Sequence, residues 1–429
     1  MIADLPPALR RAVSAYTGIV RSVEECLAAA AEPRLFQASC EVADEEGLVG
    51  VGLGHLTGIG GTGATRAEAA SAAVGEALER YAATYVPGDR LVVASASELP
   101  GAVEPERFAL FSDRQLALPG FPFRRFSGET VTTWVAGEEL PGRSPVWLPA
   151  ELVFLGLAGL PGERPVAYAT SSGLACDTDK SATVVRGLCE LLERDAFMIV
   201  WSNRLSLPLL EPPQDARLEG PFVSTGLAHA AVDLSVFHEF PIALAVVRAP
   251  DGCPGAVGVG AAAAATPERA RWKALAEAFA TRAAGATLAV LAGGAPVDRI
   301  AGFDDHIRHY ADGANAPATF FLDGSRERTP LDRVPRLEGA TPEEAIRALC
   351  RRVDAAGSTA YAVDVTSPDV AALGLTVTRV LAPGLCSLDV GQEARFLGPA
   401  RLCETAAQLG LRASVLREDD LNPDAHPFP

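Results

Sequence analysis

An acidic pattern that occurs twice constrains this chain more than any other feature of its sequence. Each copy has two glutamates three residues apart and an arginine directly after the second one: Glu76, Glu79 and Arg80, then Glu190, Glu193 and Arg194. Positions three apart lie on one face of a helix, so each copy presents two carboxylates side by side. Apolar residues flank both copies, and paired carboxylates near apolar surface need cations.

Two interpretations of this pattern are open. Hard oxygen ligands from two helices suit magnesium, which keeps several waters and completes its shell with nucleotide phosphates. The alternative is a pair of exposed helices with internal Glu–Arg pairs, each worth only about 0.2 to 0.5 kcal/mol. We take the repetition of the pattern as the best clue to function.

The composition limits the partners of the chain. Its 429 residues carry a formal net charge of −17, which argues against a surface for nucleic acid or for an anionic membrane. Lysine occurs only at Lys180 and Lys273, so arginines and a metal ion must neutralise any bound phosphate. A lysine-based phosphate loop is therefore not expected.

The sequence predicts a cytoplasmic protein. Residues 1–16 lack the apolar core of a signal peptide. The apolar stretch at 284–296 is shorter than the roughly 18 residues that a membrane span needs. The eight cysteines show neither a CxxC pair nor a disulfide framework, which suits reduced thiols.

Hydrophobic patterning predicts a mixed α/β (α+β) fold. We expect a lead-in helix and strand over residues 1–50 and one continuous domain over 51–429, because no linker interrupts the chain. Long helices are expected at 66–85 and 179–202, each with one copy of the acidic pattern. Strands are expected at 35–42, 91–94, 130–136, 166–170, 359–365 and 376–381.

A third unit of strand, turn and helix is expected at 242–284. Thr266 and Pro267 make a good cap and first-turn pair for its helix, which carries Glu277 and Arg282. Three helices would then deliver acidic residues to one shared site.

Two other patterns are weaker. Gly58, Gly60 and Gly63 satisfy GxGxxG before a helix, as in dinucleotide folds, but no acidic residue ends the next strand to bind a ribose. His306 and His309 lie three apart beside two aspartates, where an exposed polar turn is favoured over a metal site.

Several segments resemble the motifs of the YcaO family. The nucleotide motifs are GGTGAT (60–65) with GEALERY (75–81), TSSGLA (170–175) with ELLERDAF (190–197), and KALAEA (273–278). VDVT (363–366) and APGL (382–385) are similar to a late pattern in members that modify ribosomal peptides. The resemblance spans about residue 50 to the end and identifies 51–429 as a YcaO catalytic domain.

The resemblance implies a nucleotide site between the acidic helices. Magnesium ions that bridge the ATP phosphates would be held by Glu76, Glu79, Glu190 and Glu193. The arginines that would face the phosphates, or the acidic residues around them, are Arg80, Arg194 and Arg282. The nucleotide site would be completed by Glu277, Ser71 and Ser171.

The chain departs from the family pattern at two places. Ala280 stands where a glutamine often follows the third-helix glutamate, and Ala72 stands where a serine is usual, with Ser71 one place away. Both changes touch the nucleotide site, so weakened ATP binding and a degenerate, non-catalytic copy are alternatives to an active enzyme.

The proline-rich tail, NPDAHPFP (422–429), is similar to the PxPxP ending of azoline-forming members, with Ala425 in place of the first proline. Such a tail stays extended and can thread into a pocket. Without the resemblance, a disordered terminus would be the default. By resemblance, the Pro429 carboxylate or His426 would act as the general base.

The resemblance implies an ATP-dependent cyclodehydratase of ribosomally made peptides such as bacteriocins. It would convert cysteine, and serine or threonine, in a precursor peptide into thiazoline or oxazoline rings. A leader-binding E1-like or ThiF-like protein is the expected partner, and a homodimer the expected assembly, with no nucleic acid and no membrane. The alternatives are thioamide or amidine formation and a non-catalytic scaffold subunit.

Overall fold

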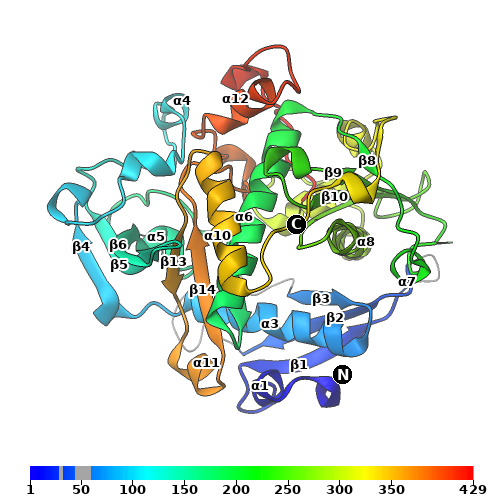
Figure 1. The fold of residues 1–429 in the computed structure, drawn as a ribbon, viewed down its shortest axis with the longest axis horizontal. Coiled ribbons are helices and arrows are strands. Elements are labelled where there is room, and N and C mark those ends of the chain that lie inside the picture. The colour runs from blue at the N-terminus through cyan, green and yellow to red at the C-terminus, as the bar shows by residue number, and fades with distance from the viewer. Residues whose placement is uncertain (29–31, 44–58, 158, 224, 429) are drawn as a thin grey trace.

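Three β-sheets and three long helices form the framework of the described chain (Figure 1). The structure is a computed structural model, and it describes residues 1–28, 32–43, 59–157, 159–223 and 225–428. The mixed α/β fold class expected from the patterning is confirmed.

Among the described residues the sheets have three, five and six strands. The first has the order β1 (Val20–Cys26), β2 (Phe36–Val42), β3 (Gly60–Gly63). The second has the order β11 (Val257–Ala263), β10 (Ile242–Arg248), β9 (Ala228–Asp233), β8 (Leu209–Leu210), β12 (Arg328–Thr329). The third has the order β4 (Leu91–Ala94), β5 (Thr132–Glu139), β13 (Tyr361–Asp364), β14 (Thr376–Leu381), β7 (Leu174–Asp177), with β6 (Ser144–Pro149) paired to β5.

Three long helices connect these sheets. They are α3 (Arg66–Thr84), α6 (Lys180–Asn203) and α8 (Pro267–Leu291). The first packs on β2, β3 and β7, the second on β14, β7 and β11, and the third on β10 and β11. Because α6 contacts both the second and the third sheet, it occupies the centre of the fold (Figure 1).

The shorter helices lie around this centre (Figure 1). They are α1 (Pro7–Arg11), α4 (Asp113–Leu116), α5 (Ala150–Val153), α7 (Ala216–Glu219), α9 (Phe303–Ala311), α10 (Pro342–Ala355), α11 (Pro368–Ala372) and α12 (Arg401–Gln408). Both α10 and α12 pack on α6, and α9 packs on α8.

Each long helix begins at a polar cap. The Thr65 hydroxyl accepts a hydrogen bond from the Glu68 amide at 3.2 Å, and Asp179 accepts from the Ser181 amide at 2.8 Å. Thr266 caps α8, and Pro267 occupies its first turn, as the sequence predicted. A side-chain oxygen at the cap satisfies one of the amides that a helix start leaves unpaired.

The strand expected at 166–170 is wrong; the strand of this unit is β7, four residues further on. The Val166 amide donates to the Glu151 carboxylate at 2.8 Å instead of to a neighbouring strand. A turn precedes β7, and Gly173 has a φ of +85° there. A hydrophobic pattern can predict a strand, but it cannot show that a buried side chain binds the backbone in place of a neighbouring strand.

The N-terminal segment also differs from the expected lead-in. Its helix α1 has only five residues, and β1 was not anticipated. Strand β1 pairs antiparallel with β2, which in turn pairs with β3. The predicted boundary at residue 50 lies outside the described residues, as does Gly58.

Helix α8 includes the first part of the apolar stretch at 284–296, so its length bears on the question of a membrane span. It is the one helix of the described residues that is long and apolar enough, with a window of mean hydropathy 1.3. In the fold Ala274, Ala278 and Phe279 are completely buried in an apolar cluster with Ala243 and Ala245 of β10. A core helix in contact with two strands has the same composition as a membrane span.

Candidate functional site

The site is built from three copies of one unit, in which a strand or turn is followed by a helix. In each copy a helix glutamate accepts a hydrogen bond from a backbone amide 16 or 17 residues upstream. The donor–acceptor pairs are Gly60 to Glu76 at 3.1 Å, Gly173 to Glu190 at 3.2 Å and Ala261 to Glu277 at 3.0 Å. The repeated bond fixes each glutamate against the backbone that precedes its helix.

Arginines and a fourth amide hold further oxygens of Glu76, Glu190 and Glu193. Arg80 pairs with Glu76 at 2.5 Å, one helical turn apart. Arg194 pairs with Glu190 at 3.4 Å and with Glu193 at 3.1 Å. The Ala263 amide of β11 donates to Glu193 at 2.8 Å, so α6 is tied to the sheet that carries α8.

The carboxylates of the three helices lie close enough to affect one another. Burial raises the pKa of Glu79 well above its usual range, and the charges of Glu190 and Glu76 add to this effect. Burial also raises the pKa of Glu190, although Arg194 opposes it. Glu277 of α8 has a pKa of about 8, raised by burial and by Glu193 and Glu190 against the opposing charge of Arg194.

Burial is the largest cause of these three upward shifts, and the nearby arginines only partly offset it. A divalent cation would supply further positive charge, so the donor set fits Mg²⁺. Among the described residues no three His, Cys, Asp or Glu side chains form a ready metal cage. Magnesium usually takes only one or two carboxylates together with waters and phosphates, which fits the open arrangement.

Arg282 has partners outside this cluster. Arg282 pairs with buried Glu32 and donates to the Pro254 carbonyl at 3.1 Å. Ser71 lies on α3, five residues before Glu76. Ser171 lies in the turn before β7, where its carbonyl accepts from the Leu174 amide at 3.0 Å.

Sequence reasoning missed one basic residue of the cluster. Arg379 lies on β14, and the charges of Glu190 and Glu79 stabilise its ionised form. A single arginine within the otherwise uncharged strand 376–381 was the available signal. The strand itself was predicted correctly.

The tail threads into the protein as far as the structure describes it. Trp201 donates to the Asp424 carbonyl at 3.0 Å, and the Tyr310 hydroxyl donates to the Ala425 carbonyl at 2.6 Å. The ring of Phe428 is completely buried and lies under the Arg194 guanidinium, 4.1 Å from its carbon to the ring centroid. The expected threading is confirmed for 422–428, whereas Pro429 lies outside the described residues.

Both histidines near the tail are buried. Nε2 of His426 donates to the Asp389 carbonyl at 2.8 Å, and its Nδ1 accepts from the Phe428 amide at 3.3 Å. Burial lowers the pKa of His426 well below its usual range. His306, expected in an exposed turn, is instead completely buried on α9 and stacks on His426 with 4.1 Å between ring centroids. The expected exposure is wrong because the tail covers this face of α9.

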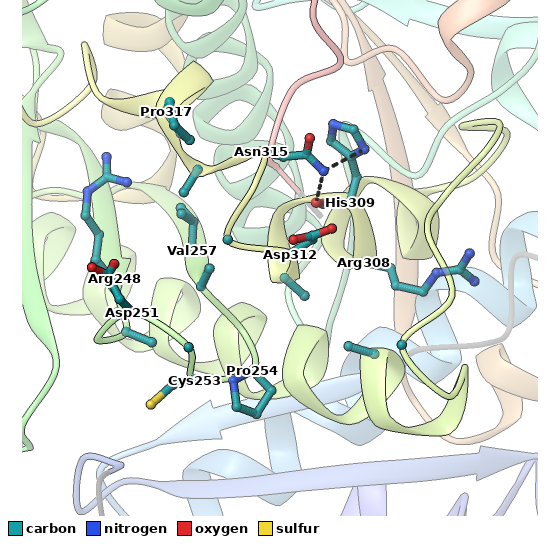
Figure 2. A pocket seen from close by; sticks show the side chains of 18 of the residues that line it. Arg248, Asp251, Cys253, Pro254, Val257, Arg308, His309, Asp312, Asn315 and Pro317 are labelled. Atoms are coloured by element: carbon teal, nitrogen blue, oxygen red, sulfur yellow. Dashed lines mark hydrogen bonds between the residues drawn. The ribbon is translucent and has the colours of Figure 1, made fainter.

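A separate cavity of about 1090 Å³ opens between the β10–β11 loop, the end of α8, and α9 (Figure 2). Arg248, Cys253 and His309 are among its lining residues, and none of the predicted site residues lines it. Asn315 donates to the His309 carbonyl at 2.9 Å on its rim. The cavity is therefore not part of the acidic cluster.

Residues 60–386 match the model of a protein family described as YcaO cyclodehydratase, binding ATP and Mg²⁺. The chain belongs to the YcaO family. The matched range contains α3, α6 and α8, and therefore all the glutamates of the site. The family assignment expected from the motifs is confirmed.

Several solved structures have the same fold. A heterocyclase in complex with substrate and cofactor superposes with a TM-score of 0.77 at 22% identity, over 97% of this chain and 56% of that one. YcaO from Methanopyrus kandleri bound with AMPPCP and Mg²⁺ gives 0.59 at 20% identity, over 86% of each chain. The Escherichia coli microcin synthetase McbBCD complex gives 0.61 at 12% identity, over 86% of this chain and 89% of that one. The chain spans about half the length of the heterocyclase that it matches.

Proposed function

We propose that this YcaO protein is an ATP-dependent cyclodehydratase that forms thiazoline or oxazoline rings in a ribosomal precursor peptide. The observation that carries the proposal is the convergence of glutamates from α3, α6 and α8 with raised carboxyl pKa values. A site with surplus negative charge, held in place by backbone amides, is suited to metal-bound phosphates.

The residues of the cluster have separate roles in this proposal. Glu76, Glu79, Glu190 and Glu193 hold Mg²⁺, and Glu277 closes the nucleotide site from α8. When bound, Mg²⁺ neutralises charge that develops on a transferring phosphoryl group. Arg80 and Arg194 hold the glutamates through the pairs described above and supply positive charge beside the phosphates. Ser71, Ser171 and Arg282 belong to the periphery of the site.

The proposed reaction activates a peptide amide. A cysteine thiol, or a serine or threonine hydroxyl, attacks the preceding amide carbonyl and loses its proton, which leaves a tetrahedral oxyanion in a five-membered ring. The oxyanion accepts the γ-phosphoryl group of ATP, and ADP departs. Loss of phosphate with the amide proton then forms the C=N bond of the azoline. Catalysis of these steps is mainly positioning and charge stabilisation.

The contacts of the tail support a role for it in this chemistry. Phe428 contacts Arg194, so the described end of the tail reaches an arginine of the acidic cluster. Either the Pro429 carboxylate or His426 would take the nucleophile's proton. Because both ring nitrogens of His426 already bind backbone groups, we favour Pro429 for this role.

Further parts of the proposal concern assembly and location. A separate E1-like or ThiF-like protein would bind the leader of the precursor peptide, and residues 51–429 would form the catalytic domain of a homodimer. One fact supports a partner protein: the Escherichia coli microcin synthetase with the same fold is a complex. The eight thiols are free, which suits the cytoplasm, and a bacteriocin with thiazole or oxazole rings is the expected class of product.

Calorimetry with Mg²⁺ and a non-hydrolysable ATP analogue tests the nucleotide site. Wild type should bind, and the double variant Glu190→Gln, Glu193→Gln should lose binding. The matched control is Glu338→Gln, Glu393→Gln, which removes two exposed glutamates that also pair with arginines. Absence of binding by wild type would instead support the scaffold interpretation based on Ala280 and Ala72.

The type of reaction needs a second measurement with peptide and partner. Ring formation removes one water per cysteine, serine or threonine and needs no added nucleophile, whereas a thioamide requires a sulfur donor and an amidine an amine. Mass spectrometry of the peptide after ATP turnover distinguishes these products. Unchanged ring formation by a chain without 425–429 would contradict the role of the tail.

A further inference from the structure

Arg379 occupies an unusual position for a charged side chain. It lies in β14, opposite Val363 of β13 and Leu174 of β7, and only 4% of its surface is exposed. Its Nη1 donates to the Thr170 carbonyl at 2.5 Å, while its Nε makes no hydrogen bond to a described residue. An arginine inside a sheet is costly to bury unless nearby negative charge compensates it.

The compensating charges come from two different acidic helices. Burial lowers the pKa of Arg379 to about 10, and Glu190 of α6 and Glu79 of α3 oppose this effect. The guanidinium is therefore still positive near neutral pH. Arg80 and Arg194 belong to the acidic helices themselves, whereas Arg379 comes from the sheet beneath them.

Arg379 and its neighbour also hold the turn that anchors Glu190. Arg379 binds the Thr170 carbonyl at the start of this turn, and the Val380 amide donates to the Gly173 carbonyl at 2.7 Å at its end. The Gly173 amide in turn donates to Glu190. The same strand thus supplies positive charge to Glu190 and fixes the turn that positions it.

We propose that Arg379 is the resident cation of the acidic cluster, a positioning residue that makes the site select a metal–nucleotide complex over a free divalent cation. A free divalent ion is repelled by the guanidinium. A nucleotide with one Mg²⁺ carries net negative charge and is attracted by it. The attraction of the metal–nucleotide complex rests on the proposed function. The repulsion of a free divalent cation rests on the acidic cluster alone.

Removal of the Arg379 charge should therefore raise the affinity for a free divalent cation and lower the affinity for the Mg²⁺–nucleotide complex. In Arg379→Gln we expect Mn²⁺ alone to bind about tenfold more tightly. The reason is that the repulsion between one positive charge and a nearby cation is of this size in a partly buried site. We expect the Mg²⁺ complex of a non-hydrolysable ATP analogue to bind about tenfold more weakly. Arg379→Lys keeps the charge and should stay close to wild type in both measurements. Loss of structure alone would weaken both ligands together.

The experiment compares four purified full-length proteins: wild type, Arg379→Gln, Arg379→Lys and Arg271→Gln. Arg271 is equally buried but pairs with Glu219, so its variant controls for the loss of a buried arginine elsewhere. Free Mn²⁺ is counted by electron paramagnetic resonance, and nucleotide binding is measured by calorimetry. Equal or weaker Mn²⁺ binding by Arg379→Gln would overturn the inference.

Two other outcomes are also decisive. If wild type does not bind the nucleotide complex, the proposed function fails, while the Mn²⁺ comparison still decides the role of Arg379. If Arg379→Gln does not fold, Arg379→Lys decides: wild-type Mn²⁺ affinity supports the charge role, and failure of the lysine variant to fold assigns Arg379 to packing and overturns the inference.

Discussion

The ring of Phe428 lies against the guanidinium of Arg194, so the tail of the chain contacts the arginine that pairs with Glu190 and Glu193. Phe197, three residues after Arg194 on α6, supports the same ring with 4.9 Å between centroids. The acidic cluster is therefore built from three helices and closed by a fourth segment that arrives from the other end of the sequence.

Substitution of Phe428 should release the tail. Full burial of a phenylalanine is worth about 1.5 to 3 kcal/mol, and the cation–π contact adds about 0.5 to 2 kcal/mol. In Phe428→Ala we expect faster hydrogen exchange of the tail amides and weaker binding of the Mg²⁺–nucleotide complex. Phe428→Leu keeps most of the packing and isolates the contribution of the ring. Tail protection identical to wild type in both variants would contradict this contact.

Nucleotide binding should release protons. The pKa of Glu277 is about 8, so this carboxyl is mostly protonated near neutral pH, and a bound cation favours its ionised form. We expect apparent affinity for the Mg²⁺–nucleotide complex to rise as pH increases toward 8. Calorimetry in two buffers of different ionisation enthalpy counts the released protons. Identical binding enthalpies in the two buffers would argue against the prediction, and Glu277→Gln should show a smaller buffer dependence.

Asp195 should make the fold sensitive to acid. It is completely buried, accepts from the Cys386 amide at 2.9 Å and pairs with His238 at 2.9 Å and Arg401 at 2.6 Å. Burial opposes its ionisation, but these partners outweigh it and hold the pKa well below the usual range. A depressed carboxyl pKa stabilises the fold fully above the unfolded value of about 3.9, and this stability is lost as pH falls below it.

The variant Asp195→Asn leaves Arg401 without its carboxylate. We expect a loss of about 3 to 5 kcal/mol in the free energy of unfolding at neutral pH. The difference in unfolding free energy between wild type and the variant should become smaller in acid, because protonation of Asp195 weakens its pair with Arg401 in wild type as well. Urea unfolding of both proteins, at neutral pH and at a pH below about 3.9, measures this difference in unfolding free energy. A difference that is larger in acid than at neutral pH would refute the assignment.

Gly173 should tolerate no side chain. Its φ is +85°, and a Cβ there would lie 2.3 Å from the Val380 carbonyl oxygen. In Gly173→Ala we expect a loss of more than about 1 kcal/mol in stability together with weaker nucleotide binding, since the turn also anchors Glu190. Gly101→Ala is the matched control, because Gly101 has a φ of +84° and open space around it. If Gly173→Ala and Gly101→Ala had similar effects on stability and nucleotide binding, backbone strain alone would explain both. That result would contradict the role of the turn.

Much of this architecture could be predicted from the sequence. Helix α3 begins at the predicted residue, α8 begins at its predicted cap, and strands β4 and β14 match their predicted ranges. These features depend on local patterning, which repeats every two residues in a strand and every 3.6 in a helix. The expected strand at 166–170 failed because the Glu151 side chain, not a strand, binds its backbone.

The sequence by itself determined that Glu76, Glu79, Glu190, Glu193 and Glu277 project from helices, because their spacing and caps are local properties. Only the tertiary structure decided that α3, α6 and α8 bring these carboxylates together, that Arg379 lies beneath two of them, and that Arg282 pairs with Glu32 instead. The physical reason is that charge interactions depend on distance and burial, and residues far apart in the chain acquire both only when the sheets and helices pack.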